Sequence, residues 1–134
     1  MKVSVIVPCR NERAESGAVR EKRAVQRTAD LEWDAWIADG ESTDGTRKQI
    51  EEFARRDPRI RLISNPARGA AAGLNRALAH SAGEIVIRMD VHTRYADDYI
   101  AESVAALERH GADNAGGPWR ASGGSYIQCA IAAA

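Results

Sequence analysis

"VSVIV" at residues 3–7 decides the fold class of this chain. The run is rich in β-branched residues and continuous, without the alternation that is typical of a half-exposed strand. It therefore predicts a strand buried on both faces, as in a parallel sheet that helices cover on either side. Three further runs of the same kind follow, "DAWIAD" at 34–39, "IRLIS" at 60–64 and "EIVIRMD" at 84–90.

Segments with helical periodicity separate these predicted strands. Apolar residues recur at spacings of three and four in residues 45–56, 68–81 and 97–111. The last of these helices is expected to have Asp97 as its N-cap and to stop at Gly111. Residues 13–30 carry only a thin apolar stripe, but a helix is still expected there because parallel strands need a crossover connection.

This alternation predicts an α/β fold, with an open, mostly parallel, Rossmann-like sheet and helices on both of its faces. The 134 residues suit a single domain, residues 1–134. Residues 112–119 predict a further short strand, and residues 123–134 begin an apolar helix without a polar finish. We therefore expect the chain to be the N-terminal part of a longer protein.

Composition narrows the classes of function. The chain is 44% hydrophobic and 28% charged with zero net charge, so it lacks the basic character of a nucleic-acid-binding protein. Cys9 and Cys129 lie far apart and form neither a disulfide framework nor a zinc motif. No apolar stretch approaches the ~20 residues of a membrane helix. The first residues do not resemble a signal peptide, so a cytoplasmic location is expected.

Polar clusters follow three of the four predicted strands. They are "PCRNE" at 8–12, "DGESTDGT" at 39–46 and "DVHTRY" at 90–95. Each cluster alone has an ordinary explanation as a helix cap, a turn or an acid that accepts hydrogen bonds from loop amides. Ligands of open parallel sheets bind outside the carboxyl ends of the strands, where all three clusters would meet. Their convergence predicts a binding site.

Asp90 and His92 are the candidate metal ligands of this site. In an extended segment alternate side chains point the same way, so both could face one divalent ion. His80 and His110 lie near predicted helix ends and receive no role. The phosphate-binding motifs G-x-x-x-x-G-K-[ST] and G-x-G-x-x-G are both absent after the strands.

The order and spacing of three segments resemble the inverting glycosyltransferases of family 2, which have a GT-A fold. The segments are "VSVIVPCRNE", "IADGESTDGT" and "NPARGAAAGLNRALAHSAGEIVIRMDVHTRY". The resemblance covers residues 3–119 apart from 13–30, and "MDVHTRYADDYI" with "GGPWR" is most similar to the bacterial exopolysaccharide branch, of the succinoglycan-assembly type. It implies that the chain is the nucleotide-sugar-binding half of a GT-A domain.

The resemblance also implies roles for individual residues. The first loop and the acid after the second strand would hold the base and ribose, and the start of the helix after the third strand would lie near the nucleotide sugar. The implied nucleotide-sugar-binding residues are Pro8, Arg10, Asn11, Glu12, Asp39, Arg68, Gly69 and Asp90. The implied metal ligands, for Mn²⁺ or Mg²⁺, are Asp90 and His92.

Two positions depart from the family pattern. Gly40 stands where many members carry a second acid, and His92 replaces the second acid of the metal motif. Imidazole suits Mn²⁺ better than Mg²⁺, which prefers oxygen ligands. The general base that an inverting transfer needs is expected beyond residue 134, so no catalytic residue is assigned within the chain.

The resemblance implies transfer of a sugar from a nucleotide-sugar donor to a saccharide or lipid-linked acceptor in polysaccharide biosynthesis. A UDP-sugar is the donor that the resemblance favours. This places the protein at the cytoplasmic face of the inner membrane, with peripheral membrane association through the missing C-terminal part. Two alternatives stay open. The chain could be a truncated, inactive nucleotide-binding fragment. A nucleotidyltransferase would share the sheet, but it would want a glycine- and lysine-rich loop after the first strand.

Overall fold

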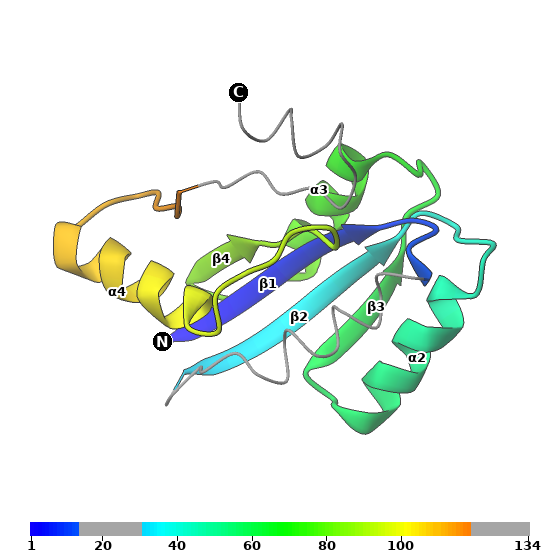
Figure 1. The fold of residues 1–134 in the computed structure, drawn as a ribbon, viewed down its shortest axis with the longest axis horizontal. Helices are drawn as coiled ribbons and strands as arrows, with labels where there is room; N and C mark the ends of the chain where they lie inside the picture. Colours follow the sequence, from blue (N-terminus) through cyan, green and yellow to red (C-terminus); the bar gives the residue numbers. More distant parts are fainter. Residues whose placement is uncertain (14–30, 119–134) are drawn as a thin grey trace, which may run out of the picture.

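Four parallel strands form one open sheet in the computed structural model, which describes residues 1–13 and 31–118 (Figure 1). Their spatial order is β3-β2-β1-β4. The strands are β1 Lys2–Cys9, β2 Glu32–Asp39, β3 Ile60–Ser64 and β4 Ile85–Arg88. The prediction of an open parallel sheet is therefore confirmed, with the first strand of the chain in its interior.

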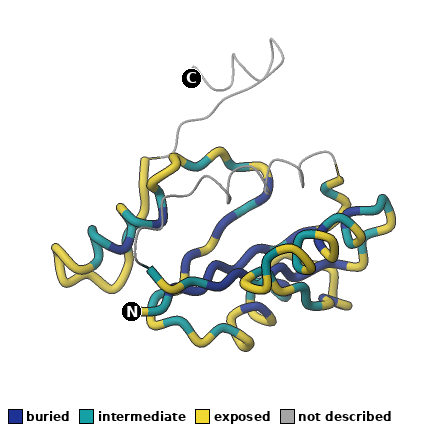
Figure 2. The backbone as a smooth tube through the Cα atoms, turned by 90° about the horizontal axis from the view of Figure 1, so that it is seen from below, coloured by how far each residue is buried: buried dark blue, intermediate teal, exposed yellow. Residues whose placement is uncertain are grey.

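Among the described residues, three helices cover both faces of this sheet. They are α2 Thr46–Arg56, α3 Ala70–His80 and α4 Tyr99–His110. Alternate residues of β1 face opposite ways, because Val5 packs with Ile50 of α2 and Val104 of α4, whereas Ile6 packs with Ala77 of α3. The central strands β1 and β2 are thus buried on both faces for most of their length, which is why their sequences are mostly apolar. In Figure 2 the buried residues concentrate along the strands.

The ends of the elements differ in part from the prediction. Gly111 ends α4 with a left-handed φ of 56°, as expected, but the N-cap is Asp98 rather than Asp97. The strand predicted for residues 112–119 is wrong over its described part, because residues 112–118 form no strand. This segment is rich in glycine and polar residues and lies mostly exposed, so it has little apolar surface to bury against the sheet. The helices expected at 13–30 and 123–134, residue 13 apart, lie outside the described residues.

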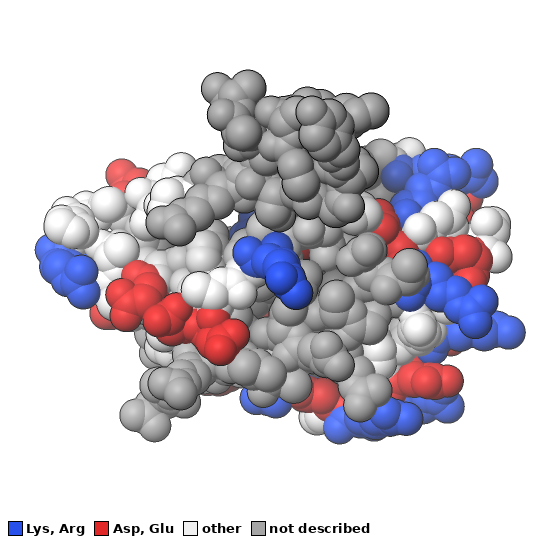
Figure 3. Space-filling model, in the orientation of Figure 1, with Lys and Arg blue, Asp and Glu red and all other residues white. Residues whose placement is uncertain are grey.

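The surface of α2 carries charges of both signs next to one another (Figure 3). Within the described residues, none of the helices combines the length and the apolar character needed to cross a membrane.

Candidate functional site

A cleft of about 200 Å³ opens at the carboxyl ends of the strands. The sheet register explains its position, because Cys9, Asp39 and Ser64 end neighbouring strands side by side. The loops after β1, β3 and β4 therefore meet at one edge, although they are far apart in the sequence. Seven of the residues singled out from the sequence line the cleft, namely Pro8, Arg10, Glu12, Arg68, Gly69, Asp90 and His92. The predicted convergence is present for the clusters at 8–12 and 90–95, whereas the cluster at 39–46 does not line the cleft and the loop after β3 does.

A larger hollow of about 650 Å³ lies elsewhere, between the free edge of β4 and helix α4. None of the residues predicted for the site lines this hollow. Of these two hollows in the described part of the chain, the smaller cleft is therefore the better candidate, because it gathers the predicted polar side chains.

His92 and Glu12 connect two sides of the cleft. The distance from Nε2 of His92 to Oε1 of Glu12 is 2.8 Å. The His92 side chain is 67% exposed and that of Glu12 is 19% exposed, so this contact lies at the mouth of the cleft. It joins the loop after β1 to the loop after β4 across 80 residues of sequence.

The segment that carries Asp90 and His92 is a turn and not an extended strand. The amide of Thr93 donates to the carbonyl of Asp90 at 3.4 Å, and β4 already ends at Arg88. The expectation that Asp90 and His92 point the same way because they alternate in an extended segment is therefore wrong. Both still line the cleft, since the turn folds back over the strand ends.

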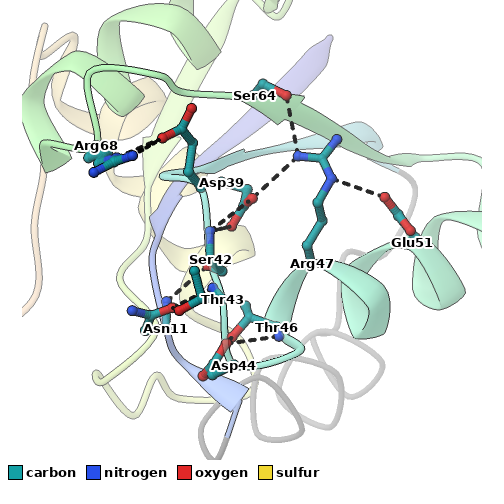
Figure 4. Close-up of polar contacts among 11 residues, drawn as sticks. Asn11, Asp39, Ser42, Thr43, Asp44, Thr46, Arg47, Glu51, Ser64 and Arg68 are labelled. Atoms are coloured by element: carbon teal, nitrogen blue, oxygen red, sulfur yellow. Dashed lines mark hydrogen bonds and ion pairs between the residues drawn. The ribbon is translucent and has the colours of Figure 1, made fainter.

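Asn11 lies outside the lining of the cleft and holds two loops together instead. The backbone amide of Asn11 donates to Oγ of Ser42 at 2.9 Å, and the side-chain Oδ1 of Asn11 accepts from the backbone amide of Thr43 at 2.8 Å (Figure 4). Its left-handed φ of 53° is a conformation that asparagine tolerates better than most residues. Asn11 thus fixes the loop after β1 against the loop after β2.

Asp39 also lies outside the lining, and its side chain is fully buried. Its carboxylate accepts from the amide of Ser42 at 3.3 Å and from Nη1 of Arg47 at 3.3 Å. Figure 4 shows Arg47 reaching from α2 to Asp39 and to Ser64, with its Nε on Glu51. A buried carboxylate needs such partners, because an unpaired charge away from water is costly. Arg47 was not anticipated from the sequence.

The "STDGT" segment matches its ordinary reading as a turn that starts a helix. Oδ1 of Asp44 accepts from the amide of Thr46 at 3.0 Å and from its hydroxyl at 2.5 Å. The Thr46 hydroxyl is the largest cause that lowers the pKa of Asp44. Gly45 is the N-cap residue, with a left-handed φ of 95° that glycine adopts at little cost. This cluster is structural.

Glu41 and Arg68 form an ion pair that bridges the loops after β2 and β3 at 2.5 Å. Both residues have left-handed backbones, with φ of 57° and 61°. Gly40 lies beside this pair, and a β-carbon there would be 3.0 Å from the carbonyl oxygen of Arg68 and 3.2 Å from the side chain of Arg10. A side chain at this position would therefore require the Arg68 backbone or the Arg10 side chain to shift.

Two further residues near the site were missed in the sequence. Asn65 lines the cleft and is 2% exposed; its Nδ2 donates to the carbonyl of Gly69, while its Oδ1 has no partner within the described part of the chain. The hydroxyl of Tyr95 accepts from the amide of Asp90 at 2.9 Å, and burial is the largest cause that raises the pKa of Tyr95. Asn65 could have been noticed, because it directly follows a predicted strand. Tyr95 gave no such signal.

Comparisons with known proteins agree with this geometry. The family model described as "Glycosyl transferase family 2" matches residues 4–130. The succinoglycan biosynthesis protein ExoA of Rhizobium meliloti is 38% identical over 112 residues, which cover 82% of this chain and 34% of that protein. The UDP-Glc:alpha-D-GlcNAc-diphosphoundecaprenol beta-1,3-glucosyltransferase WfgD of Escherichia coli is 34% identical over 89 residues, covering 66% of this chain and 34% of that protein.

Solved structures give the same picture. The mannosyltransferase PcManGT from Pyrobaculum calidifontis, solved in complex with GDP-Man and Mn2+, superposes with a TM-score of 0.71 at 32% identity. The match covers 78% of this chain and 32% of that one. The chain thus spans about a third of the length of the relatives it matches.

Proposed function

This chain belongs to glycosyltransferase family 2, and on that premise we propose that the protein transfers a sugar from a nucleotide-sugar donor to a saccharide or lipid-linked acceptor. We further propose that the donor is UDP-linked and that the reaction serves polysaccharide biosynthesis, as the names of the two curated relatives suggest for those proteins. The observation that carries the proposal is the cleft, which brings the family's motif residues from three loops to one edge of the sheet.

The charges in the cleft suit a nucleoside diphosphate. Arg10 and Arg68 enter from opposite loops, and guanidinium groups recognise phosphate oxygens through paired hydrogen bonds. Helix α3 begins at Ala70 beside the cleft without an acid in its first turn, so its free amides favour an anion. We place the diphosphate there, with Pro8 and Glu12 on the nucleoside side and Gly69 allowing close approach.

Asn11 and Asp39 take a supporting part in this proposal. Both fix the loop 40–43 that flanks the nucleoside side, through the contacts of Asn11 to Ser42 and Thr43 and of Asp39 to Ser42. Because the carboxylate of Asp39 is buried and held by Arg47, a direct contact from Asp39 to a base requires Arg47 to move.

We propose that Asp90 and His92 hold a divalent metal ion. Their carboxylate and imidazole donors fit Mn²⁺, and the carboxylate fits Mg²⁺ as well. No group of three His, Cys, Asp or Glu side chains suited to a metal occurs within residues 1–13 and 31–118, so phosphate oxygens and water would complete the ligand set. When bound, such an ion supplies Lewis-acid stabilisation of the leaving diphosphate.

An inverting transfer also needs a general base that takes the proton of the acceptor hydroxyl. We propose that this base belongs to the part of the protein that the relatives have and this chain does not span. The acceptor-binding surface and a peripheral contact with the cytoplasmic face of the inner membrane are assigned to the same part. The chain itself then binds the donor without transferring the sugar.

Titration calorimetry with UDP tests the donor site. We expect UDP to bind the chain more tightly with Mn²⁺ than without it, and Asp90→Ala to abolish that difference. Asp97→Ala is the matched control, because Asp97 is an exposed acid seven residues away that does not line the cleft. UDP binding that changes neither with Mn²⁺ nor with Asp90→Ala would exclude the metal from the proposal. If the chain binds GDP but not UDP, a UDP-linked donor would be excluded.

A radiolabelled UDP-sugar assay with a crude lipid-linked acceptor pool tests whether the chain binds the donor without transferring the sugar. We expect no transfer by the 134-residue chain, because loss of a general base alone costs ~10²–10⁴ in rate. Transfer that depends on Asp90 would show that the base lies within this chain.

A further inference from the structure

We propose that Tyr95 is a positioning residue that fixes the turn carrying Asp90. The inference rests on the proposed function, since it concerns the acid assigned there to the metal and the diphosphate. The observation behind it is the hydrogen bond of 2.9 Å from the amide of Asp90 to the hydroxyl of Tyr95.

This hydroxyl gives the amide of Asp90 a partner outside the described sheet, in which β4 is an edge strand. The amide of Met89 still donates to the carbonyl of Ile6 in the neighbouring strand, at 3.0 Å. Asp90 comes one residue later, where its amide meets Tyr95 instead. The Tyr95 hydroxyl also meets the side chain of Thr93, whose amide closes the turn onto the carbonyl of Asp90 at 3.4 Å. A single hydroxyl therefore contacts both ends of the turn 90–93.

The Tyr95 ring anchors this hydroxyl to the body of the protein. Its centroid lies 4.8 Å from that of Tyr99 in the first turn of α4, with the two planes inclined at 52°. Both rings pack against the core cluster that contains Val91 and Ile100, each 3% exposed. The position of the turn is thus tied to α4.

The side chain of Asp90 has only a weak restraint of its own. Arg88 approaches it at 3.4 Å, but that guanidinium side chain is 61% exposed and the Asp90 side chain 40% exposed. Exposed ion pairs contribute little, because water and salt screen them. The backbone therefore determines where the carboxylate of Asp90 lies. Since Tyr95 holds that backbone without lining the cleft, it acts on the site through Asp90.

Tyr95→Phe tests the inference, because it keeps the ring in the core and removes the hydroxyl alone. Tyr99→Phe is the matched control; its ring lies in the same cluster, but it does not touch the amide of Asp90. We expect Tyr95→Phe to weaken UDP binding in the presence of Mn²⁺ by about three- to tenfold, the usual range for one lost hydrogen bond. UDP binding without metal should match that of Tyr99→Phe. A purely structural role would weaken UDP binding without metal as well.

Amide hydrogen exchange supplies a readout that does not depend on any ligand. The amide of Asp90 should lose protection in Tyr95→Phe and keep it in Tyr99→Phe. Equal Mn²⁺-supported UDP binding by the two variants, with the wild type binding normally, would overturn the positioning role while the proposed function stands. If the wild type shows no Mn²⁺-supported binding, the proposed function fails. Hydrogen exchange alone then tests whether Tyr95 holds the turn. Unchanged protection of the Asp90 amide in Tyr95→Phe would overturn the positioning role.

Discussion

Replacing Arg47 with methionine should destabilise the fold through Asp39. The carboxylate of Asp39 is fully buried, and Nη1 of Arg47 approaches it at 3.3 Å. The only other partner found for it within the described residues is the amide of Ser42, at 3.3 Å. Methionine keeps most of the apolar stem and removes the charge and the donors, so the carboxylate stays buried with a single hydrogen-bond partner.

The magnitude follows from the exposure of the two groups. A hydrogen bond to a charged group contributes about 1.5–3 kcal/mol, and leaving one partner of a buried pair unpaired costs about 3–5 kcal/mol. The Arg47 side chain is 42% exposed, so water can enter the space that it leaves. We therefore expect a cost at the lower end, about 2 kcal/mol in the free energy of unfolding.

A double-mutant cycle in urea measures this directly, with the wild type, Arg47→Met, Asp39→Asn and the double variant. Asp39→Asn removes the buried charge, so Arg47→Met should cost less on that background, with a coupling of about 1–2 kcal/mol. Lys48→Met is the control, because it removes one positive charge from the adjacent, exposed position of α2. A coupling below about 0.3 kcal/mol, or an equal cost for Lys48→Met, would refute the reasoning.

Two other substitutions test the departures from the family pattern. Gly40→Asp should destabilise the chain by about 1–3 kcal/mol in urea and weaken UDP binding rather than restore a base contact, because a β-carbon there would lie 3.0 Å from the Arg68 carbonyl oxygen. Gly116→Asp is the control and should be neutral, because a β-carbon at Gly116 meets open space. An equal effect of the two substitutions would contradict the argument. His92→Asp should lower the thermal midpoint without metal, because it places a second carboxylate near Glu12. In thermal-shift titrations it should also shift the ion preference from Mn²⁺ toward Mg²⁺. An unchanged preference would show that His92 is not a metal ligand.

The sheet could be predicted because the burial of each strand leaves a local signal, a short run of mostly apolar residues. The runs at 3–7, 34–39 and 60–64 lie within β1, β2 and β3, since strands in the interior of a parallel sheet are predominantly apolar. Parallel strands end at a common edge, and this rule alone brought residues as distant as Glu12 and His92 together. Fold and cleft therefore followed from local patterns and one topological rule.

The details of the cleft could not be predicted, because individual side-chain contacts set them. The chain after β4 forms a turn, since the Tyr95 hydroxyl holds the amide of Asp90 and the Tyr95 ring packs beside α4. The burial of Asp39 depends equally on Arg47, which lies on the following helix. Neither contact leaves a periodic signal in the sequence.

The loss of the acid at Gly40 and the presence of Glu41 can be understood as one change. In the family pattern two acids follow the second strand directly, whereas here glycine separates Asp39 from Glu41. Gly40 lets Arg10 and the backbone of Arg68 approach the strand end closely, which a side chain at this position would prevent. Glu41 then pairs with Arg68 at 2.5 Å. The negative charge of Glu41 therefore lies one residue after Gly40, where it pairs with Arg68, a cation of the cleft.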